Sequence, residues 1–145
     1  MITNNNTVSQ RIEFDCSYLV KPVDATQYTL QGCRYLVEAT VQNKYATETG
    51  VVIEFRKLRD YLAACVPDHA FLYHHSSSVA SQIATTLNQI GVRVKSYAVP
   101  ICAENICENI AFQLQALLDE YSPGVVVVEV KLRENSDSVA TYKAY

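Results

Sequence analysis

Two long stretches near the beginning of the chain alternate apolar and polar residues, which is the pattern of half-buried strands. The first runs from Thr7 to Val20 and the second from Leu30 to Gln42. Their apolar faces carry Val8, Ile12, Phe14, Cys16 and Tyr18 in the first, and Tyr35, Val37, Ala39 and Val41 in the second. We expect the two segments to form a long antiparallel hairpin. Gly32 lies inside the second strand, where a glycine often marks a bulge.

Three later segments have the apolar spacing of amphipathic helices. They are Phe55–Val66, which Pro67 ends, a helix capped by the serines at 76–78 and stopped by Gly91, and Ala103–Tyr121. The residues predicted to face inward are Phe55, Leu58, Leu62 and Cys65 in the first, Val79, Ile83, Leu87 and Ile90 in the second, and Ile106, Ile110, Leu114, Leu117 and Leu118 in the third.

The remaining segments complete a sheet. Val92–Val99, Val125–Leu132 and Val139–Tyr145 are predicted strands, residues 135–138 form the loop of the last hairpin, and Asp68–His75 is predicted to be a loop. Strands grouped in hairpins around a block of helices predict an α+β fold. We expect an antiparallel four-stranded sheet with helices on one face.

The composition narrows the class of protein. A chain of 145 residues favours a single domain over residues 1–145, and 49% apolar with 19% charged residues excludes disorder. With a net charge of −3 and no basic run, neither nucleic acid nor a membrane is an expected partner. The N-terminus has no signal-peptide pattern, so we expect a cytoplasmic protein. Its five cysteines form no CxxC pair and are predicted to be buried thiols.

Several short motifs, in order and spacing, resemble those of the 6-pyruvoyl- and 6-carboxy-tetrahydropterin synthase family. The resemblance spans Phe14 to Tyr142. Its motifs are FDCSYL at 14–19, QGCRY at 31–35, TGVVIEF at 49–55 followed by Leu58, Asp68-His69 followed by Leu72, AENI at 103–106, and Glu134 eight residues before Tyr142.

This resemblance implies a ββααββ unit called the tunnelling fold, assembled as a trimer or hexamer with active sites between subunits. Members act on dihydroneopterin triphosphate, using a zinc ion that polarises the substrate side chain. A cysteine, or an acid in its place, shuttles protons with an Asp-His pair, and a glutamate holds the pterin ring. Carried over by position, the catalytic pair is Asp68 and His69, and the ligand-binding residues are Glu134, Cys102 and Glu104.

The chain departs from the family at the metal. The positions of the three zinc-binding histidines hold Tyr18, Gln31 and Cys33, and that of the shuttle cysteine holds Gln27. A neutral amide is a poor zinc ligand, a phenol would have to lose its proton, and a glutamine cannot act as acid or base. We therefore expect no cofactor. The alternative is a zinc ion held by other ligands, such as His69, Cys33 or a residue of a neighbouring subunit.

Each candidate residue also has a plain structural interpretation. Asp68 and His69 are either an orienting carboxylate–imidazole pair or an ordinary loop. Glu134 is either a carboxylate that accepts the two adjacent donors of a pterin or an exposed turn residue. Glu104 suits the helix dipole whatever the function. His74-His75 is interpreted as a solvated loop, because adjacent residues point apart and no third ligand lies nearby in the sequence.

Three functions stay open. The first is a pterin-transforming lyase with altered or absent metal. The second is a non-catalytic relative that binds a pterin- or purine-like molecule, and the third is a structural subunit of a hetero-oligomer. Because zinc supplies several kcal/mol of charge stabilisation in such chemistry, we favour the second. We also predict a homo-oligomer, because antiparallel edge strands need partners.

Overall fold

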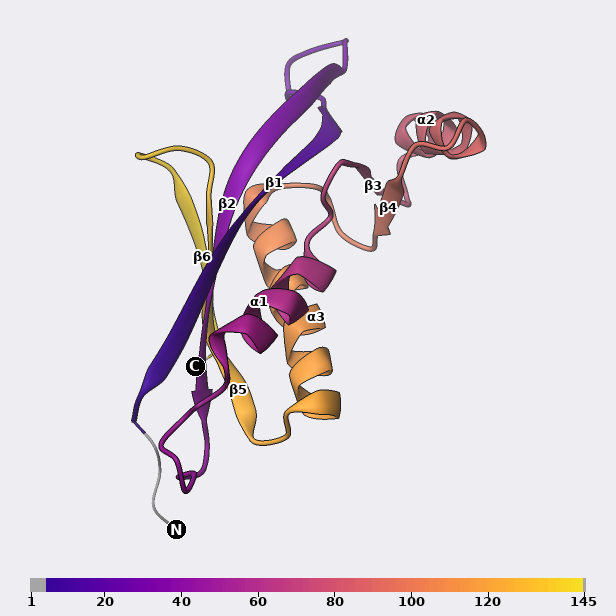
Figure 1. Cartoon of the computed structure of the whole chain (residues 1–145). Helices are drawn as coiled ribbons and strands as arrows, with labels where there is room; N and C mark the ends of the chain where they lie inside the picture. The colour runs from indigo at the N-terminus through magenta and orange to yellow at the C-terminus, as the bar shows by residue number, and fades with distance from the viewer. Residues whose placement is uncertain (1–4, 145) are drawn as a thin grey trace.

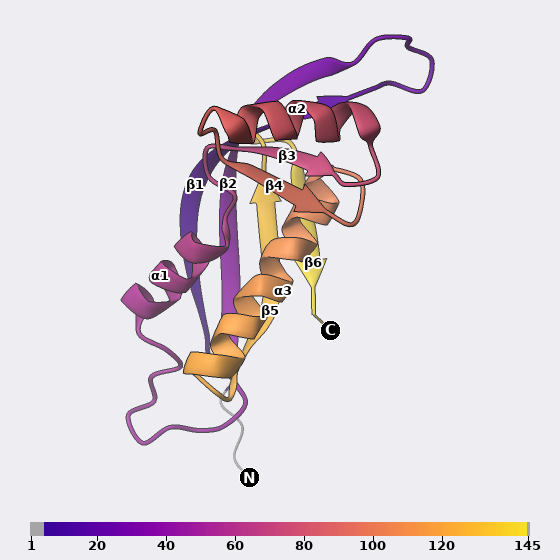
Figure 2. The ribbon, with the colours of Figure 1, turned by 90° about the vertical axis from the view of Figure 1, so that its right-hand side faces the viewer.

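The computed structural model describes residues 5–144, which form a sheet covered by helices. The strands are β1 (Thr7–Val20), β2 (Thr29–Asn43), β3 (Ala70–His74), β4 (Val94–Tyr97), β5 (Val125–Arg133) and β6 (Val139–Lys143). The helices are α1 (Phe55–Cys65), α2 (Ser78–Gln89) and α3 (Ala103–Tyr121). Helices α1 and α3 pack side by side on one face of the sheet, whereas α2 packs on the other side of β3 and β4 (Figure 1 and Figure 2). The predicted α+β class is confirmed, but the prediction that all helices lie on one face is wrong for α2, which covers the opposite face of β3.

The sheet has six strands rather than four, in the order β4-β3-β1-β2-β5-β6. The antiparallel part, β1-β2-β5-β6, is the four-stranded sheet that was predicted. On the other side of β1, however, β3 and β4 are added in parallel. Parallel neighbours need a crossover connection, and α2 supplies it by passing over β3 and β4 (Figure 2).

The loop predicted at Asp68–His75 was therefore wrong. Its residues Ala70, Phe71 and Leu72 are all buried in β3. A strand covered on both faces reads as a short apolar run without alternation. In so short a run, the sequence carries no period that separates a strand from a loop.

The hydrophobic core lies between β1, β2 and β5 and the helices α1 and α3. The alternation of β1 and β2 is confirmed, because Phe14 and Tyr35 are direct cross-strand partners and both are buried. Their rings lie 5.6 Å apart, centroid to centroid. The buried residues of the helices are Leu58, Leu62 and Cys65 in α1, Ala80 and Ala84 in α2, and Ile106, Cys107, Ile110, Ala111, Leu114 and Leu118 in α3.

Two details of the helix prediction were wrong. Phe55, at the first position of α1, is 64% exposed. The face of α2 that packs on β3 and β4 is centred on Ala80 and Ala84, whereas Val79 and Ile90 are exposed. Two small alanines allow α2 to approach the short parallel strands closely. The apolar spacing alone therefore misplaced the buried stripe of α2.

The ends of α2 follow the predicted signals. The Ser77 side chain caps the first turn by accepting a hydrogen bond from the Ala80 backbone N–H. Gly91 follows the helix with a φ of +88°, a left-handed conformation that favours glycine. Gly32, by contrast, marks no bulge, since β1 and β2 pair without a shift. The irregularity lies between Thr40 and Val41, where β2 pairs with β5.

Among residues 5–144, no helix has the length and apolar character needed to cross a membrane.

Candidate functional site

The positions matched to zinc ligands lie on the helix-covered face of the β1–β2 hairpin. Tyr18 and Gln31 are direct cross-strand partners, and Cys33 follows two residues after Gln31, so all three side chains leave the same face. The Tyr18 hydroxyl forms a 3.0 Å hydrogen bond with the buried Tyr35 hydroxyl. The Cys33 thiol donates to the Tyr18 hydroxyl at 3.7 Å. Gln31 is exposed.

The surroundings of the two tyrosines keep them protonated at neutral pH. Burial raises the pKa of Tyr18 to about 12. Burial and the hydrogen bond with Tyr18 raise the pKa of Tyr35. Neutral phenols offer weak oxygen donors in place of the imidazole, thiolate or carboxylate that zinc prefers. At this point of the hairpin the chain therefore has a hydrogen-bonded phenol pair with a thiol beside it.

The side chains of Asp68 and His69 are in contact in the turn that precedes β3. His69 Nδ1 lies 2.9 Å from Asp68 Oδ1. His69 has a φ of 53°, and it is the single non-glycine residue with positive φ in the described part of the chain. Such a backbone costs of order 1 kcal/mol or more and clusters at functional sites. The surrounding structure must therefore hold this turn in place.

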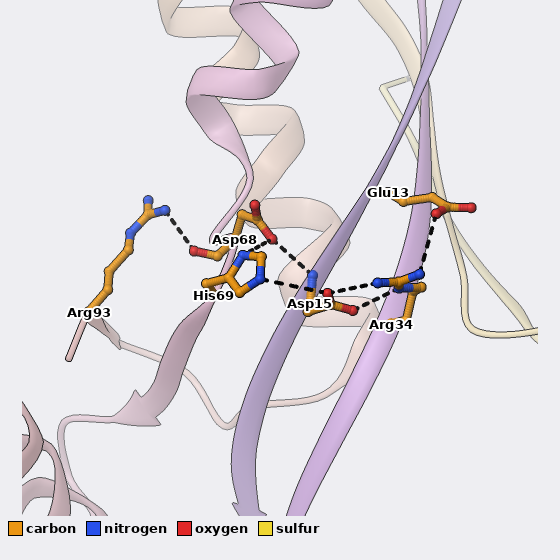
Figure 3. A network of polar contacts seen from close by, with 6 residues as sticks. All are labelled: Glu13, Asp15, Arg34, Asp68, His69 and Arg93. Atoms are coloured by element: carbon orange, nitrogen blue, oxygen red, sulfur yellow. Dashed lines mark hydrogen bonds and ion pairs between the residues drawn. The ribbon is translucent and has the colours of Figure 1, made fainter.

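Strand β1 supplies that support through Asp15, a residue that sequence reasoning missed (Figure 3). The Asp15 backbone N–H donates to Asp68 Oδ1 at 3.0 Å, and its C=O accepts from the His69 N–H at 2.6 Å. The Asp15 carboxylate lies 3.9 Å from His69 Nε2. The imidazole is thus flanked by two carboxylates, one from the turn and one from the strand.

Two arginines hold this network from outside. Arg34, the cross-strand partner of Asp15, donates to both oxygens of its carboxylate at 2.9 and 3.1 Å. Arg93 donates to the Asp68 C=O at 2.9 Å (Figure 3). The bond to Arg34 is the main reason why the pKa of Asp15 lies below its usual range. The sequence offers one signal for this network. Once β1 and β2 are aligned as a hairpin, Asp15 lies directly opposite Arg34.

The network and the tyrosine pair lie on opposite faces of β1. Asp15 alternates with the inward-facing Cys16, and Tyr18 follows on the inward face. Within one chain, Asp68 and His69 therefore do not converge with Tyr18 and Cys33. Ligand atoms of Asp15, Asp68 and His69 all lie within 4.8 Å of one another, which suits a metal ion. However, Arg34 already occupies the Asp15 carboxylate.

Glu134 and Glu104, which the resemblance marks as ligand-binding, line the same hollow of about 180 Å³. Glu134 comes directly after β5, and its backbone N–H bonds the Ser138 C=O at 3.0 Å to close the predicted hairpin loop. Glu104 lies in the first turn of α3. The hollow is acidic and opens at the start of a helix.

Cys102 lies beside this hollow rather than in its lining. It is the residue before α3, and its side chain caps no backbone N–H of the helix. Burial raises the pKa of the Cys102 thiol. Of the other candidates, Gln27 is exposed in the loop between β1 and β2. His74 ends β3 and His75 follows it, with their rings 5.4 Å apart.

We predict that the Asp68 carboxylate makes the free energy of unfolding decrease as the pH falls into the acidic range. The hydrogen bond from the Asp15 N–H, followed by that to His69, lowers the Asp68 pKa from its ordinary 3.8. A carboxyl group whose pKa is lowered by folding stabilises the folded state at pH values above its pKa in the unfolded chain. This contribution is lost as the pH falls through the folded value.

Urea unfolding at a series of pH values from 6 to 3 measures this effect. Asp68→Asn keeps an oxygen for the Asp15 N–H but cannot titrate, so it should lose less free energy of unfolding below about pH 4 than the unmodified chain. Asp60→Asn, on the exposed face of α1, is the matched control and should follow the unmodified chain. Parallel pH profiles for the Asp68 variant and the unmodified chain would contradict the prediction.

The sequence motifs indicated one protein family, and comparison with family models confirms that assignment. The family model for 6-pyruvoyl tetrahydropterin synthase matches residues 7–145, so the chain belongs to this family. It is 25% identical over 144 residues to a 6-carboxy-5,6,7,8-tetrahydropterin synthase of Haemophilus influenzae, covering 94% of this chain and 97% of that protein.

Solved structures of family members share the fold. The 6-pyruvoyl tetrahydropterin synthase of Caenorhabditis elegans superposes with a TM-score of 0.67 at 14% identity, over the full length of both chains. The Plasmodium falciparum 6-pyruvoyl tetrahydropterin synthase gives 0.65 at 18% identity, covering 97% of this chain and 99% of the other. An uncharacterized protein of Wolinella succinogenes gives 0.72 at 14% identity, covering 97% and 98%.

Proposed function

We propose that this chain is a divergent relative of the pterin synthases. It binds a pterin- or purine-like ring and does not carry out the family's usual zinc-dependent chemistry. The observation that carries the binding half is the meeting of Glu134 and Glu104 in one hollow. A pterin or guanine presents an amino group beside a ring N–H, and a carboxylate accepts hydrogen bonds from both side by side. The hollow is therefore suited to a ring with a paired-donor edge.

The residues at the three metal positions support the second part of the proposal, that the chain does not carry out the zinc-dependent chemistry. Tyr18, whose pKa burial raises to about 12, keeps its proton, and its hydroxyl is hydrogen-bonded to that of Tyr35. Gln31 offers only a neutral amide. Cys33 is the one credible donor, and a single thiolate does not make a zinc site. This set of donors does not fit a zinc ion.

The pair Asp68–His69 favours a second candidate, a pterin-transforming lyase with another metal or none. The two side chains are 2.9 Å apart, and His69 has a positive φ. The Asp15 backbone N–H donates a hydrogen bond to Asp68. At Asp68 and His69 the chemistry that remains is proton transfer by an imidazole held between carboxylates. The sites of the family lie between subunits, so the pair would serve a neighbouring copy. The predicted homo-oligomer and cytoplasmic location stay predictions.

Calorimetric titration with pterin and guanosine tests the proposal, with adenosine, which lacks the paired donors, as the ligand control. We expect pterin and guanosine to bind once per chain. Glu134→Ala should weaken binding by about 2 kcal/mol, or roughly 30-fold, because it removes a charge-assisted pair of hydrogen bonds. Glu134→Gln, which keeps one acceptor oxygen, should retain part of the affinity.

Glu120→Ala, an exposed glutamate near the end of α3, is the matched control and should bind as the unmodified chain does. Pterin binding that survives Glu134→Ala would show that the hollow is not the site. Turnover of dihydroneopterin triphosphate, followed by chromatography of the products, would instead favour the lyase.

A further inference from the structure

A second cavity, of about 270 Å³, lies beside Pro100 and Ile101, in the segment that connects β4 to α3. It is formed where β1 and β3 end, where α2 begins, and where the tip of the β1–β2 hairpin turns back. The end of β3 and the start of α2 lie beside the projecting hairpin (Figure 2). The carboxyl ends of parallel strands are a common place for ligands in sheets of this kind.

The floor of this cavity is apolar and firmly built. Leu72, in β3, is fully buried, and Ala80, in α2, is 5% exposed. Leu19, Val20 and Ile101 add further apolar surface. A cavity of this size is somewhat smaller than the roughly 300–1,000 Å³ of typical small-molecule sites, which limits the ligand to about one ring. The floor suits the flat apolar body of such a molecule.

The rim of the cavity is cationic and aromatic. Lys21 Nζ lies 5.5 Å from the centre of the Tyr28 ring, and both residues line the opening with Tyr73 and His74. No carboxylate is among the residues that line this cavity. Lys21 belongs to none of the ion pairs between the described residues. The positive end of the α2 dipole has the same sign.

This cavity and the Glu104–Glu134 hollow therefore have opposite charge. They share no lining residue and flank the same short segment, with Pro100 and Ile101 on one side and Ala103 and Glu104 on the other. A donor-rich ring matches the acidic hollow, and an anion matches the rim with Lys21. The two sites therefore select different ligand chemistry.

We propose that the cavity between β1, β3 and α2 binds a small molecule that combines one aromatic ring with one anionic group, a carboxylate or a phosphate. The ring lies against the half-buried side chains of Leu19, Val20 and Ile101, above the Leu72 and Ala80 backbone, and contacts the Tyr28 ring. The anion pairs with the Lys21 ammonium. This site is separate from the proposed pterin hollow and does not depend on it.

NMR titration of the full chain tests the proposal with phenyl phosphate as the probe. Benzyl alcohol supplies the ring without the charge, and inorganic phosphate supplies the charge without the ring. We expect saturable shifts of the backbone amides of Leu72 and Ala80 with phenyl phosphate. Benzyl alcohol and inorganic phosphate should each bind at least about tenfold more weakly than phenyl phosphate, because each lacks either the ion pair or the ring contact.

Two exposed substitutions separate the contributions without disturbing the core. Lys21→Gln should weaken phenyl phosphate by about tenfold, the value of one charge-assisted contact, and leave benzyl alcohol unchanged. Tyr28→Ala should weaken both ring-bearing probes. Lys44→Gln, at an exposed lysine outside the cavity, is the matched control, and Glu134→Gln should also leave phenyl phosphate binding unchanged.

Three results would overturn the proposal. They are phenyl phosphate shifts that do not saturate, shifts that map away from Leu72 and Ala80, or equal loss of affinity in the Lys21 and Lys44 variants. A loss caused by Glu134→Gln would assign the probe to the acidic hollow instead.

Discussion

Replacing Tyr18, Gln31 and Cys33 with histidine is expected to create a three-imidazole zinc site on the β1–β2 hairpin. The backbone already places the three positions on one face of the hairpin, with Tyr18 directly opposite Gln31. Cross-strand partners have Cβ atoms about 5 Å apart, and the diagonal neighbour lies within about 7–8 Å. Three imidazoles at these positions reach a common ion at the usual Zn–N distance of about 2.0–2.1 Å.

The expected gain in zinc affinity is at least about 1,000-fold over the unmodified chain, since three imidazoles replace a phenol, an amide and a thiol. Loss of the buried Tyr18 ring should destabilise the metal-free variant by a few kcal/mol. Added zinc should recover part of that free energy of unfolding by mass action. Zinc content per chain and thermal unfolding with and without zinc measure the two effects.

The double variant Gln31→His and Cys33→His, which keeps Tyr18, is the matched control. It should bind zinc at least about tenfold more weakly than the triple variant, because it lacks one imidazole. Stoichiometric zinc in the unmodified chain, held through Tyr18, Gln31 and Cys33, would refute the argument. Equal zinc affinity of the triple variant and the unmodified chain would refute it as well.

Tyr35→Ala is expected to cost about 3–5 kcal/mol of the free energy of unfolding, the largest loss predicted for one substitution in this chain. The Tyr35 ring is 1% exposed and packs against Phe14 at 5.6 Å. Its hydroxyl is also the 3.0 Å partner of Tyr18. Alanine would leave a cavity in the core and a buried hydroxyl without that bond.

Tyr35→Phe separates the two causes, because it keeps the ring and removes the hydroxyl. We expect a loss of about 1–2 kcal/mol, since the buried Tyr18 hydroxyl gives up a partner. Tyr121→Ala is the control for the same chemical change at an exposed ring, 60% exposed and stacked on Tyr61, and should cost under about 1 kcal/mol. Urea unfolding measures all three. A Tyr35→Ala loss no larger than that of Tyr121→Ala would contradict the prediction.

Together these two predictions describe how the inherited metal positions have changed. Where the family places histidines around an ion, this chain has a hydrogen-bonded pair of tyrosines that belongs to its core. A buried phenol pair stabilises packing and needs no metal.

The pattern of the sequence by itself determined most of the architecture. Alternation over β1 and β2 fixes which side chains face the helices, because the side-chain period of a strand is two. The spacing of Ile106, Ile110, Leu114 and Leu118 fixes the buried face of α3 in the same way. The motifs at 49–55, 68–69 and 103–106 identified the family, and their order was enough to mark Asp68, His69 and Glu134.

Only the tertiary structure decided what those residues lie beside. Asp15 and Arg34 lie 19 residues apart and meet through the hairpin register, and Asp68 reaches Asp15 across 53 residues. The cavity with Lys21 on its rim needs the ends of β1 and β3 and the first turn of α2 to lie together, and the sequence assigned β3 to a loop. Local periodicity reports which face of an element is buried, because each residue sees its own neighbours. The partners across the fold depend on how the elements pack, and no local pattern encodes that.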